Sequence, residues 1–271
     1  MKVPWPAPAA QDDGDAHVRP FINETLDART LYFSVSAIQS RMQLQHADAL
    51  DLEYTRLMMG FLLFDPAPAQ IALIGLGGGS LVKFCHRHLQ RSALTVAEIN
   101  PHVVALRDAF EVPPDDARLR VITTDGAHLV RDTRERFDVL LVDGFDTEGL
   151  PKALRSQRFY DNCADVLQPG GLLVVNLHND RVHCDTWVER IRRSFAGSVL
   201  LVDDSDASNR VVFAWKGEQR SLLSAATVAR RTGMSAAACA PLRPAFARVH
   251  SAMGLLRGGS LPAGAGVTKY G

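Results

Sequence analysis

The middle of the chain alternates between short apolar runs and segments whose apolar residues recur at helical spacing. The apolar runs lie at 71–75, 94–100, 119–125, 137–145 and 171–178. The segments with helical spacing follow them in turn, at 79–90, 101–110, 126–133, 156–167 and 186–195. Short apolar strands separated by helices are typical of a parallel sheet that is covered on both faces. The pattern therefore predicts an α/β, doubly wound, Rossmann-like fold.

Two further regions flank this alternation. Residues 30–45 carry β-branched and aromatic residues in partial alternation, which predicts one or two short strands. Residues 50–64 have helical spacing, and the helix should end at Asp65 because the residue before a proline avoids the α region. At the far end, 198–204 and 210–216 follow each other closely and predict an antiparallel pair at one sheet edge.

These patterns divide the chain into five parts. The predicted parts are a disordered N-terminal tail (1–20), a small N-terminal β-segment with a helix (21–65), the Rossmann-like domain (66–216), a C-terminal helical segment (217–256) and a flexible tail (257–271). Both tails are predicted from their Pro, Ala, Asp and Gly content.

Composition and charge narrow the classes of function. Thirty basic residues balance thirty acidic ones, so no overall field favours nucleic acid or an anionic membrane. The first residues lack the apolar core of a signal peptide, and no apolar run approaches the roughly 20 residues of a membrane helix. Neither the four cysteines nor the nine histidines have a metal-binding spacing, so no metal is expected. The expectation is a cytoplasmic protein with small-molecule ligands.

The first strand of the predicted sheet runs into a glycine-rich turn. Gly75, Gly77 and Gly79 lie in the sequence GLGGG, where missing side chains let the backbone approach a ligand. The dinucleotide fingerprint G-x-G-x-x-G does not fit, because its third glycine would fall at Ser80. A phosphate-binding loop is also disfavoured, because no Gly-Lys-Ser/Thr follows.

The next two strands end in carboxylates. Glu98 lies about 20 residues beyond the turn, where an acid can accept hydrogen bonds from both ribose hydroxyls of an adenosine. Asp125 followed by Gly126 can meet an adenine ring through its carboxylate and the adjacent N–H. The alternatives are a solvated carboxylate for Glu98 and a helix N-cap for Asp125.

The fourth strand ends in two acids, Asp143 and Asp146. Confined carboxylates can hold a cationic amine or take its proton. The alternative is a turn in which Asp bonds its own backbone. A glycine turn, a Glu, an Asp-Gly and a late acid in this order indicate an S-adenosylmethionine-type nucleoside site rather than a dinucleotide site.

Five stretches together carry a family resemblance: GLGGG, VAEIN, TTDGAHLV, VLLVDGFD and FYDNCADVLQPGGLLVVNL. Through them, residues 30 to about 215 resemble the polyamine aminopropyltransferases (the spermidine synthase family), and most of all the bacterial spermidine synthase-like branch. The resemblance implies a small N-terminal β-domain joined to a methyltransferase-like Rossmann domain. It also implies transfer of an aminopropyl group from decarboxylated S-adenosylmethionine to an amine such as putrescine, and assembly as a homodimer.

The resemblance also assigns roles to individual residues. It makes Glu98 the ribose ligand and Asp125 the adenine ligand. Asp143 matches the acid that accepts the proton of the attacking amine, and Asp146 the acid that grips the amine. Two other residues match the family outside the strand ends: Tyr54 a tyrosine of the substrate channel, and Gln39 a glutamine near the donor's methionine-derived end.

Some positions differ from the family pattern. Gly78 stands where the family has an Asp that holds the amine of the donor's aminopropyl arm. Arg56 stands where the family has an acid, and no proline follows Asp146. The stretch between Gln39 and Tyr54 is shorter than in the family, so the N-terminal β-segment should be reduced.

These differences keep two other functions open. A methyltransferase, or another transferase using S-adenosylmethionine itself, would tolerate Gly78 and could pair Arg56 with the donor's carboxylate. Against it, Leu73 occupies the place where many methyltransferases carry an acid. A non-catalytic nucleoside-binding protein is the third possibility, and the presence of Asp143 argues against it.

Overall fold

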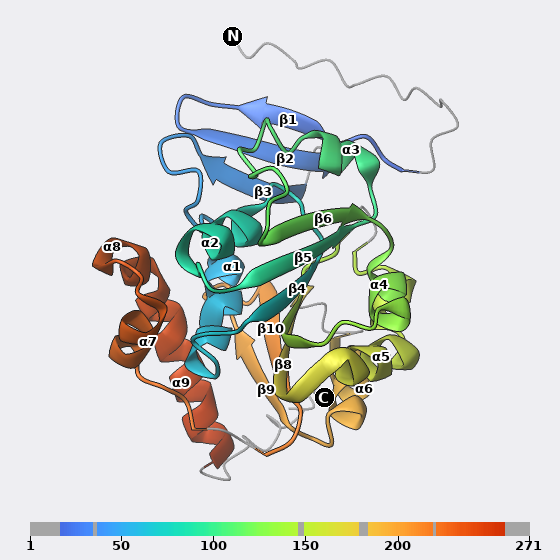
Figure 1. Cartoon of the computed structure of the whole chain (residues 1–271), viewed down its shortest axis with the longest axis vertical. Helices are drawn as coiled ribbons and strands as arrows, with labels where there is room; N and C mark the ends of the chain where they lie inside the picture. Colours follow the sequence, from blue (N-terminus) through green and yellow to red (C-terminus); the bar gives the residue numbers. More distant parts are fainter. Residues whose placement is uncertain (1–16, 35–36, 146–148, 179–183, 219–220, 258–271) are drawn as a thin grey trace, which may run out of the picture.

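The computed structural model describes residues 17–34, 37–145, 149–178, 184–218 and 221–257. It contains a seven-stranded sheet, helices on both faces of that sheet, and a separate three-stranded sheet at one end (Figure 1). This arrangement is the predicted Rossmann-like, methyltransferase-type fold with a small N-terminal β-segment.

The large sheet has the strand order β6-β5-β4-β7-β8-β10-β9. Its strands are β4 (Gln70–Ile74), β5 (Ala93–Glu98), β6 (Leu119–Thr123), β7 (Phe137–Val142), β8 (Leu167–His178), β9 (Val199–Asp203) and β10 (Asn209–Trp215). The strands from β6 to β8 are parallel, and β10 is antiparallel to both β8 and β9. The predicted antiparallel edge pair is therefore confirmed, with β10 inserted between β8 and β9.

The chain reverses its direction of travel across the sheet at β4. It first moves outward to β5 and β6, and then returns to pair β7 with the other side of β4. Doubly wound sheets bind ligands beyond the carboxyl ends of the strands at such a switch point. The topology thus places the ends of β4, β5 and β7 around one crevice.

Helices cover the two faces in two groups. The helices are α1 (Glu53–Met58), α2 (Ser80–His88), α3 (Pro101–Ala105), α4 (Gly126–Asp132), α5 (Gln157–Val166), α6 (Cys184–Ser194), α7 (Ala225–Thr232), α8 (Ala236–Cys239) and α9 (Arg243–Arg257), with 3₁₀ turns at Met59–Leu63, Lys152–Arg155 and Ala240–Leu242. One apolar core joins α1, α2 and the C-terminal helices to the sheet, and a second joins α4, α5 and α6 to its other face (Figure 1). The strands β4, β7, β8, β9 and β10 contribute side chains to both cores, which explains their apolar runs.

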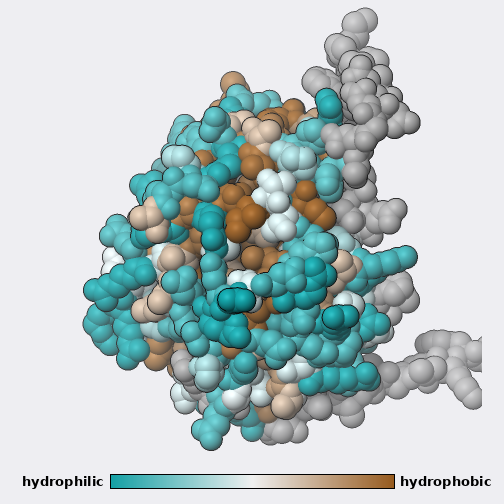
Figure 2. Space-filling model, turned by 45° about the vertical axis from the view of Figure 1, so that its right-hand side comes forward, coloured by the Kyte–Doolittle hydropathy of each residue, from teal (hydrophilic) through white to brown (hydrophobic). Residues whose placement is uncertain are grey.

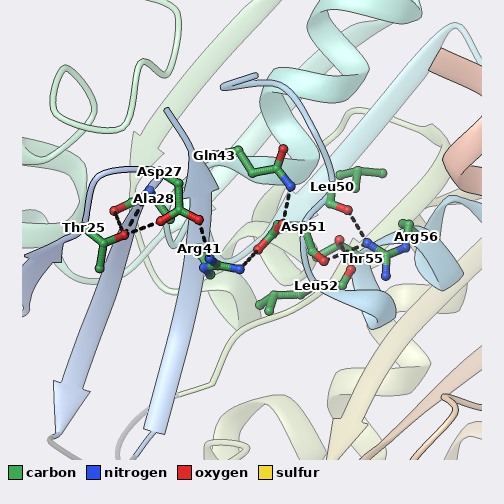
Figure 3. Close-up of polar contacts among 10 residues, drawn as sticks. All are labelled: Thr25, Asp27, Ala28, Arg41, Gln43, Leu50, Asp51, Leu52, Thr55 and Arg56. Carbon is green, nitrogen blue, oxygen red and sulfur yellow. Dashed lines mark hydrogen bonds and ion pairs between the residues drawn. The ribbon is translucent and has the colours of Figure 1, made fainter. Parts of the chain in front are cut away.

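The small sheet consists of β1 (Phe21–Glu24), β2 (Ala28–Ser34) and β3 (Ala37–Gln43), all antiparallel. A set of polar contacts fixes the chain between β3 and α1 (Figure 3). The Asp51 carboxylate accepts hydrogen bonds from Arg41 Nη1 at 2.8 Å and Gln43 Nε2 at 2.6 Å. These bonds hold the start of α1 against the small sheet and so determine where Tyr54 lies.

Three boundaries differ most from the predicted ones. The 101–110 helix ends at Ala105, followed by turns up to Glu111, whose φ is +52°. The 50–64 helix begins at Glu53 and tightens into a 3₁₀ turn from Met59 to Leu63. β8 begins at Leu167, four residues early, because Phe137 of β7 already pairs there. Most of the two predicted tails, 1–20 and 257–271, lies outside the described residues. Within them, the Val18 carbonyl oxygen accepts a hydrogen bond from Asn100 Nδ2, and Arg257 is the last residue of α9. No described helix combines the length and apolarity needed to cross a bilayer.

Candidate functional site

A cavity of about 370 Å³ lies beyond the carboxyl ends of β4, β5, β7 and β8. Figure 2 brings forward the side of the molecule where these strands end, and apolar side chains gather there inside a hydrophilic rim. Val18 and Ile99, which line the cavity, are 50% and 49% exposed. The predicted site residues that line it are Gln39, Tyr54, Gly75, Gly77, Glu98, Asp125, Gly126 and Asp143.

The glycine turn forms one wall of the cavity. Gly75 has a φ of +95°, and a Cβ there would lie 2.2 Å from the carbonyl oxygen of Asp143. Only glycine therefore lets β4 and β7 approach this closely at their ends. Gly79 is not a cavity wall: it begins α2 in the left-handed conformation and packs against Val112.

The Glu98 carboxylate is held by the backbone of the glycine turn. Its Oε2 accepts from the Leu76 N–H and its Oε1 from the Asn100 N–H, both at 2.8 Å. Burial raises the pKa of this carboxyl, while hydrogen bonds from main-chain N–H groups oppose the rise. The alternative of a solvated carboxylate is wrong, because Glu98 is only 8% exposed.

Asp125 and Gly126 line the same cavity as Glu98 and follow the neighbouring strand β6. Asp125 Oδ1 accepts from the Ala127 N–H at 2.8 Å, so the alternative reading of Asp125 as the N-cap of α4 is confirmed. A Cβ on Gly126 would lie 2.2 Å from Ile74 Cγ2, so this glycine lets α4 begin against β4. The cap fixes the Asp125 carboxylate at the cavity wall and does not conflict with a second role toward a ligand.

Asp143 lies at the end of β7 and is held by side chains from two distant elements. Asn176 of β8 donates from Nδ2 to Asp143 Oδ1 at 3.0 Å, and the hydroxyl of Tyr54, on α1, donates to the same carboxylate. Burial raises the pKa of Asp143, and the two hydrogen bonds oppose the rise. Burial, with the adjacent Asp143 charge, also raises the pKa of Tyr54, so the phenol stays a donor.

The remaining predicted residues divide between the cavity and elsewhere. Gln39 of β3 lines the cavity, and Asp146 lies outside the described residues. Arg56 does not face the cavity: its Nη1 donates to the carbonyl oxygens of Leu50 and Asp51 at 2.6 and 2.7 Å (Figure 3). The idea that Arg56 meets a donor carboxylate is therefore wrong, because its guanidinium is used to fix the chain before α1.

The space beside Gly78 is already filled. A Cβ at this position would lie 2.6 Å from Ser40 Oγ and 2.9 Å from Phe110 Cδ1. Gly78 has no left-handed φ, so the restriction comes from these neighbours and not from the backbone. The family's Asp is thus replaced by close contact between the glycine turn, β3 and the loop that carries Phe110.

Sequence reasoning missed two features of this cavity. Asn176 is 1% exposed, and its Oδ1 is buried without a partner. Phe145 and His178 stack at the cavity wall, with ring centroids 4.1 Å apart and planes 14° apart. The signal in the sequence was that DGF and NLH each stand at the end of a predicted strand. Because β7 and β8 pair in parallel, these two ends lie side by side.

Among Asp, Glu, Lys and Arg, only acidic residues line the described part of the cavity. Its acidic lining residues are Glu98, Asp125 and Asp143, its histidines are His17 and His178, and no Lys or Arg of the described chain joins them. Burial lowers the pKa of His178, which favours a neutral ring. Elsewhere in the described residues, no three His, Cys, Asp or Glu side chains are grouped to hold a metal. The cavity thus suits a ligand with positive charge.

Comparisons with known proteins agree with this geometry. Residues 51–194 match the family model of the spermine/spermidine synthase domain. A polyamine aminopropyltransferase of Neisseria meningitidis is 35% identical over 201 residues, which are 73% of this chain and 76% of the relative. The crystal structure of a probable spermidine synthase from Corynebacterium glutamicum superimposes with a TM-score of 0.66 at 19% identity, covering 78% of this chain and 82% of the other. Human methyltransferase-like protein 13, solved with S-adenosylhomocysteine, gives a TM-score of 0.58 at 21% identity, over 72% and 93% of the two chains.

Proposed function

We propose that this chain, which belongs to the spermine/spermidine synthase family, is a polyamine aminopropyltransferase. In this proposal it transfers an aminopropyl group from decarboxylated S-adenosylmethionine to an amine such as putrescine. A homodimer and a cytoplasmic location stay predictions from the sequence.

The observation that carries the proposal is the charge of the cavity. The decarboxylated donor has a sulfonium and an ammonium, and a polyamine enters as a cation, so both reactants suit a wall of Glu98, Asp125 and Asp143. S-adenosylmethionine itself would bring a carboxylate into a cavity whose described lining has no Lys or Arg, since Arg56 bonds backbone carbonyls instead. An uncompensated charge in a confined site is costly, which favours the decarboxylated donor.

The nucleoside half of the donor has its ligands in the first three strand ends. Glu98 takes the ribose hydroxyls, and Asp125 with the Gly126 N–H takes the adenine edge. The exposed Ile99 and Val18 at the mouth supply apolar surface for the base. Gly75 and Gly77 add no side chain to the turn, and Gly79 starts α2. Gln39 lies on the wall where the donor's alkyl arm would reach β3.

We assign the proton transfer to Asp143. The amine nitrogen attacks the aminopropyl carbon attached to sulfur; the N–C bond forms as the C–S bond breaks, and the electron pair leaves with sulfur as neutral methylthioadenosine. Because the acceptor nitrogen enters as an ammonium group without a free electron pair, the Asp143 carboxylate takes one of its protons before the attack. The new secondary nitrogen then leaves as an ammonium group. Its raised pKa makes Asp143 a stronger base than an exposed Asp, and Tyr54 and Asn176 keep it oriented. Asp146 is proposed to hold the far end of the amine.

A turnover assay tests this function. The protein is incubated with decarboxylated S-adenosylmethionine and putrescine, and mass spectrometry follows methylthioadenosine and spermidine. We expect the two products in equal amounts, and neither product from the Asp143→Asn variant. A parallel incubation with S-adenosylmethionine should give no methylated amine. Methyl transfer without aminopropyl transfer would overturn the proposal and support the methyltransferase alternative.

A further inference from the structure

Two pairs of side chains follow each other along the ends of β7 and β8. The strands are parallel and in register up to Val142 and Val175. The next position carries the hydrogen-bonded pair Asp143 and Asn176. Two residues further along each strand, Phe145 and His178 form the ring stack. The aromatic pair therefore lines the same cavity as the carboxylate that is proposed to take the proton, two residues further along each segment.

The surroundings of the ring pair differ from those of the nucleoside ligands. The cavity wall near the 3₁₀ turn at Lys152–Arg155 is apolar and includes Pro151 and Leu154. Phe145 packs partly against the core on the α4, α5 and α6 face, which anchors the stack from behind. On the other side, His178 and Tyr54 also border a second, smaller hollow of about 240 Å³. His178 thus borders both cavities, whereas Phe145 borders only the first.

We infer that the Phe145–His178 stack is the wall that binds the alkyl chain of the amine acceptor and so determines which amines are accepted. The inference rests on the proposed function and extends it to residues that neither the glycine turn nor the acids identify. With the attacking nitrogen at Asp143, the methylenes of the acceptor lie along the rings. Hydrocarbon packing favours alkyl amines, and an aromatic face also attracts an ammonium group.

Because the His178 imidazole can be protonated, acceptor binding should also depend on the charge of this ring. Burial lowers the pKa of His178, so its ring takes up a proton at a lower pH than an ordinary imidazole. A protonated ring would place a cation where the cationic acceptor binds. The other titratable groups that line the two cavities are His17, Tyr54, Glu98, Asp125 and Asp143 in the first and Glu53, Asp204 and Asp206 in the second. Acceptor binding should therefore weaken below neutral pH through His178 as well as through Asp143.

The test compares two His178 variants and so distinguishes the effect of the aromatic ring from the effect of its charge. His178→Phe keeps an aromatic stack and removes the titration, whereas His178→Ala removes both. At pH 8 we expect His178→Ala to raise the KM for putrescine about fivefold to tenfold, with kcat and the donor KM within twofold, and His178→Phe to stay within twofold throughout. Below pH 7 the putrescine KM should rise less in His178→Phe than in the native protein. His250→Ala is the matched control, because His250 bonds the Leu223 carbonyl outside the cavity.

Two results would overturn this inference. One is an unchanged putrescine KM in His178→Ala, and the other is an equal increase of the donor and acceptor KM. A Phe145→Leu variant gives an independent second measurement, with the same expected increase, should His178→Ala fold poorly. Absence of turnover in the native protein would instead contradict the proposed function, so the two failures are distinguishable.

Discussion

The nucleoside half and the transfer half of the cavity are built in different ways. Around Glu98 and Asp125, the carboxylates are held by main-chain N–H groups of the adjacent turn and helix. Around Asp143, the carboxylate is held by side chains, from Asn176 on β8 and Tyr54 on α1. The first half is a property of local backbone, and the second depends on three elements far apart in the sequence.

This difference explains how the two halves can vary independently. The backbone ligands of the nucleoside half persist whatever side chains surround them, provided that the turn keeps its glycines. In the transfer half, a single substitution is enough to remove a contact. Gly78 is an example, because Ser40 and Phe110 fill the space where the family has an Asp side chain. Substitutions in the two halves should therefore separate the chemical step from donor binding.

The largest effect is expected for Asp143→Asn. The amide cannot take the proton, so kcat should fall by about 10³-fold or more. Donor binding should change less than threefold, because the nucleoside ligands are untouched. Single-turnover kinetics and titration with methylthioadenosine measure the two quantities. A variant with near-native kcat would remove Asp143 from the proton transfer.

Glu98→Gln is expected to weaken donor binding and to leave the chemical step unchanged. Loss of the charged acceptor should raise the donor KM about 10-fold to 100-fold, because hydrogen bonds to charged groups contribute about 1.5–3 kcal/mol. The value of kcat at saturating donor should stay within threefold, because Asp143 and its partners are unchanged. Initial rates over a wide donor range provide both parameters. A decrease in kcat without an increase in the donor KM would contradict the division of the cavity into a nucleoside half and a transfer half.

A smaller effect is expected for Asn176→Leu, which tests the orientation of Asp143. Its hydrogen bond lowers the pKa of Asp143 against the effect of burial, so removing it raises that pKa further. The acidic limb of the kcat/KM profile should therefore move to higher pH, with about tenfold lower activity at pH 7. Asn176→Gln should recover part of the activity. An unshifted pH profile would make Asn176 a packing residue only.

The smallest effect concerns Gly78. Gly78→Ala places a Cβ 2.6 Å from Ser40 Oγ and 2.9 Å from Phe110, so overpacking should lower the free energy of unfolding by about 1–3 kcal/mol. Thermal denaturation should show a decrease in Tm of a few degrees. The double variant Gly78→Ala with Ser40→Ala should recover part of the loss. Additive effects of the two substitutions would mean that the residues do not compete for this space.

Much of the fold and the nucleoside half could be predicted because their signals are local. The apolar runs marked the strands of the large sheet, and Glu98 and Asp125 follow directly from the strand ends where the cavity lies. Boundaries were less predictable. The end of α3 at Ala105 and the early start of β8 depend on turns and on pairing with β7, which no local pattern reveals.

The rest of the transfer half depends on contacts between distant segments. Asn176 and His178 lie at the end of a mostly apolar strand. Only the register of this strand with β7 brings them to Asp143 and Phe145. Arg56 looked available for a ligand, yet its partners are backbone carbonyls five and six residues earlier. Such contacts follow from the packed fold and not from the spacing of residues.

Calorimetric titration of the native protein with decarboxylated and intact S-adenosylmethionine tests the central claim most directly. The claim is that the cavity accepts a donor whose tail is a cation, because carboxylates line it and no Lys or Arg of the described chain faces it. We predict that the decarboxylated donor binds at least tenfold more tightly than S-adenosylmethionine, with methylthioadenosine between them or near the former. Equal binding, or tighter binding of the carboxylated donor, would contradict this account.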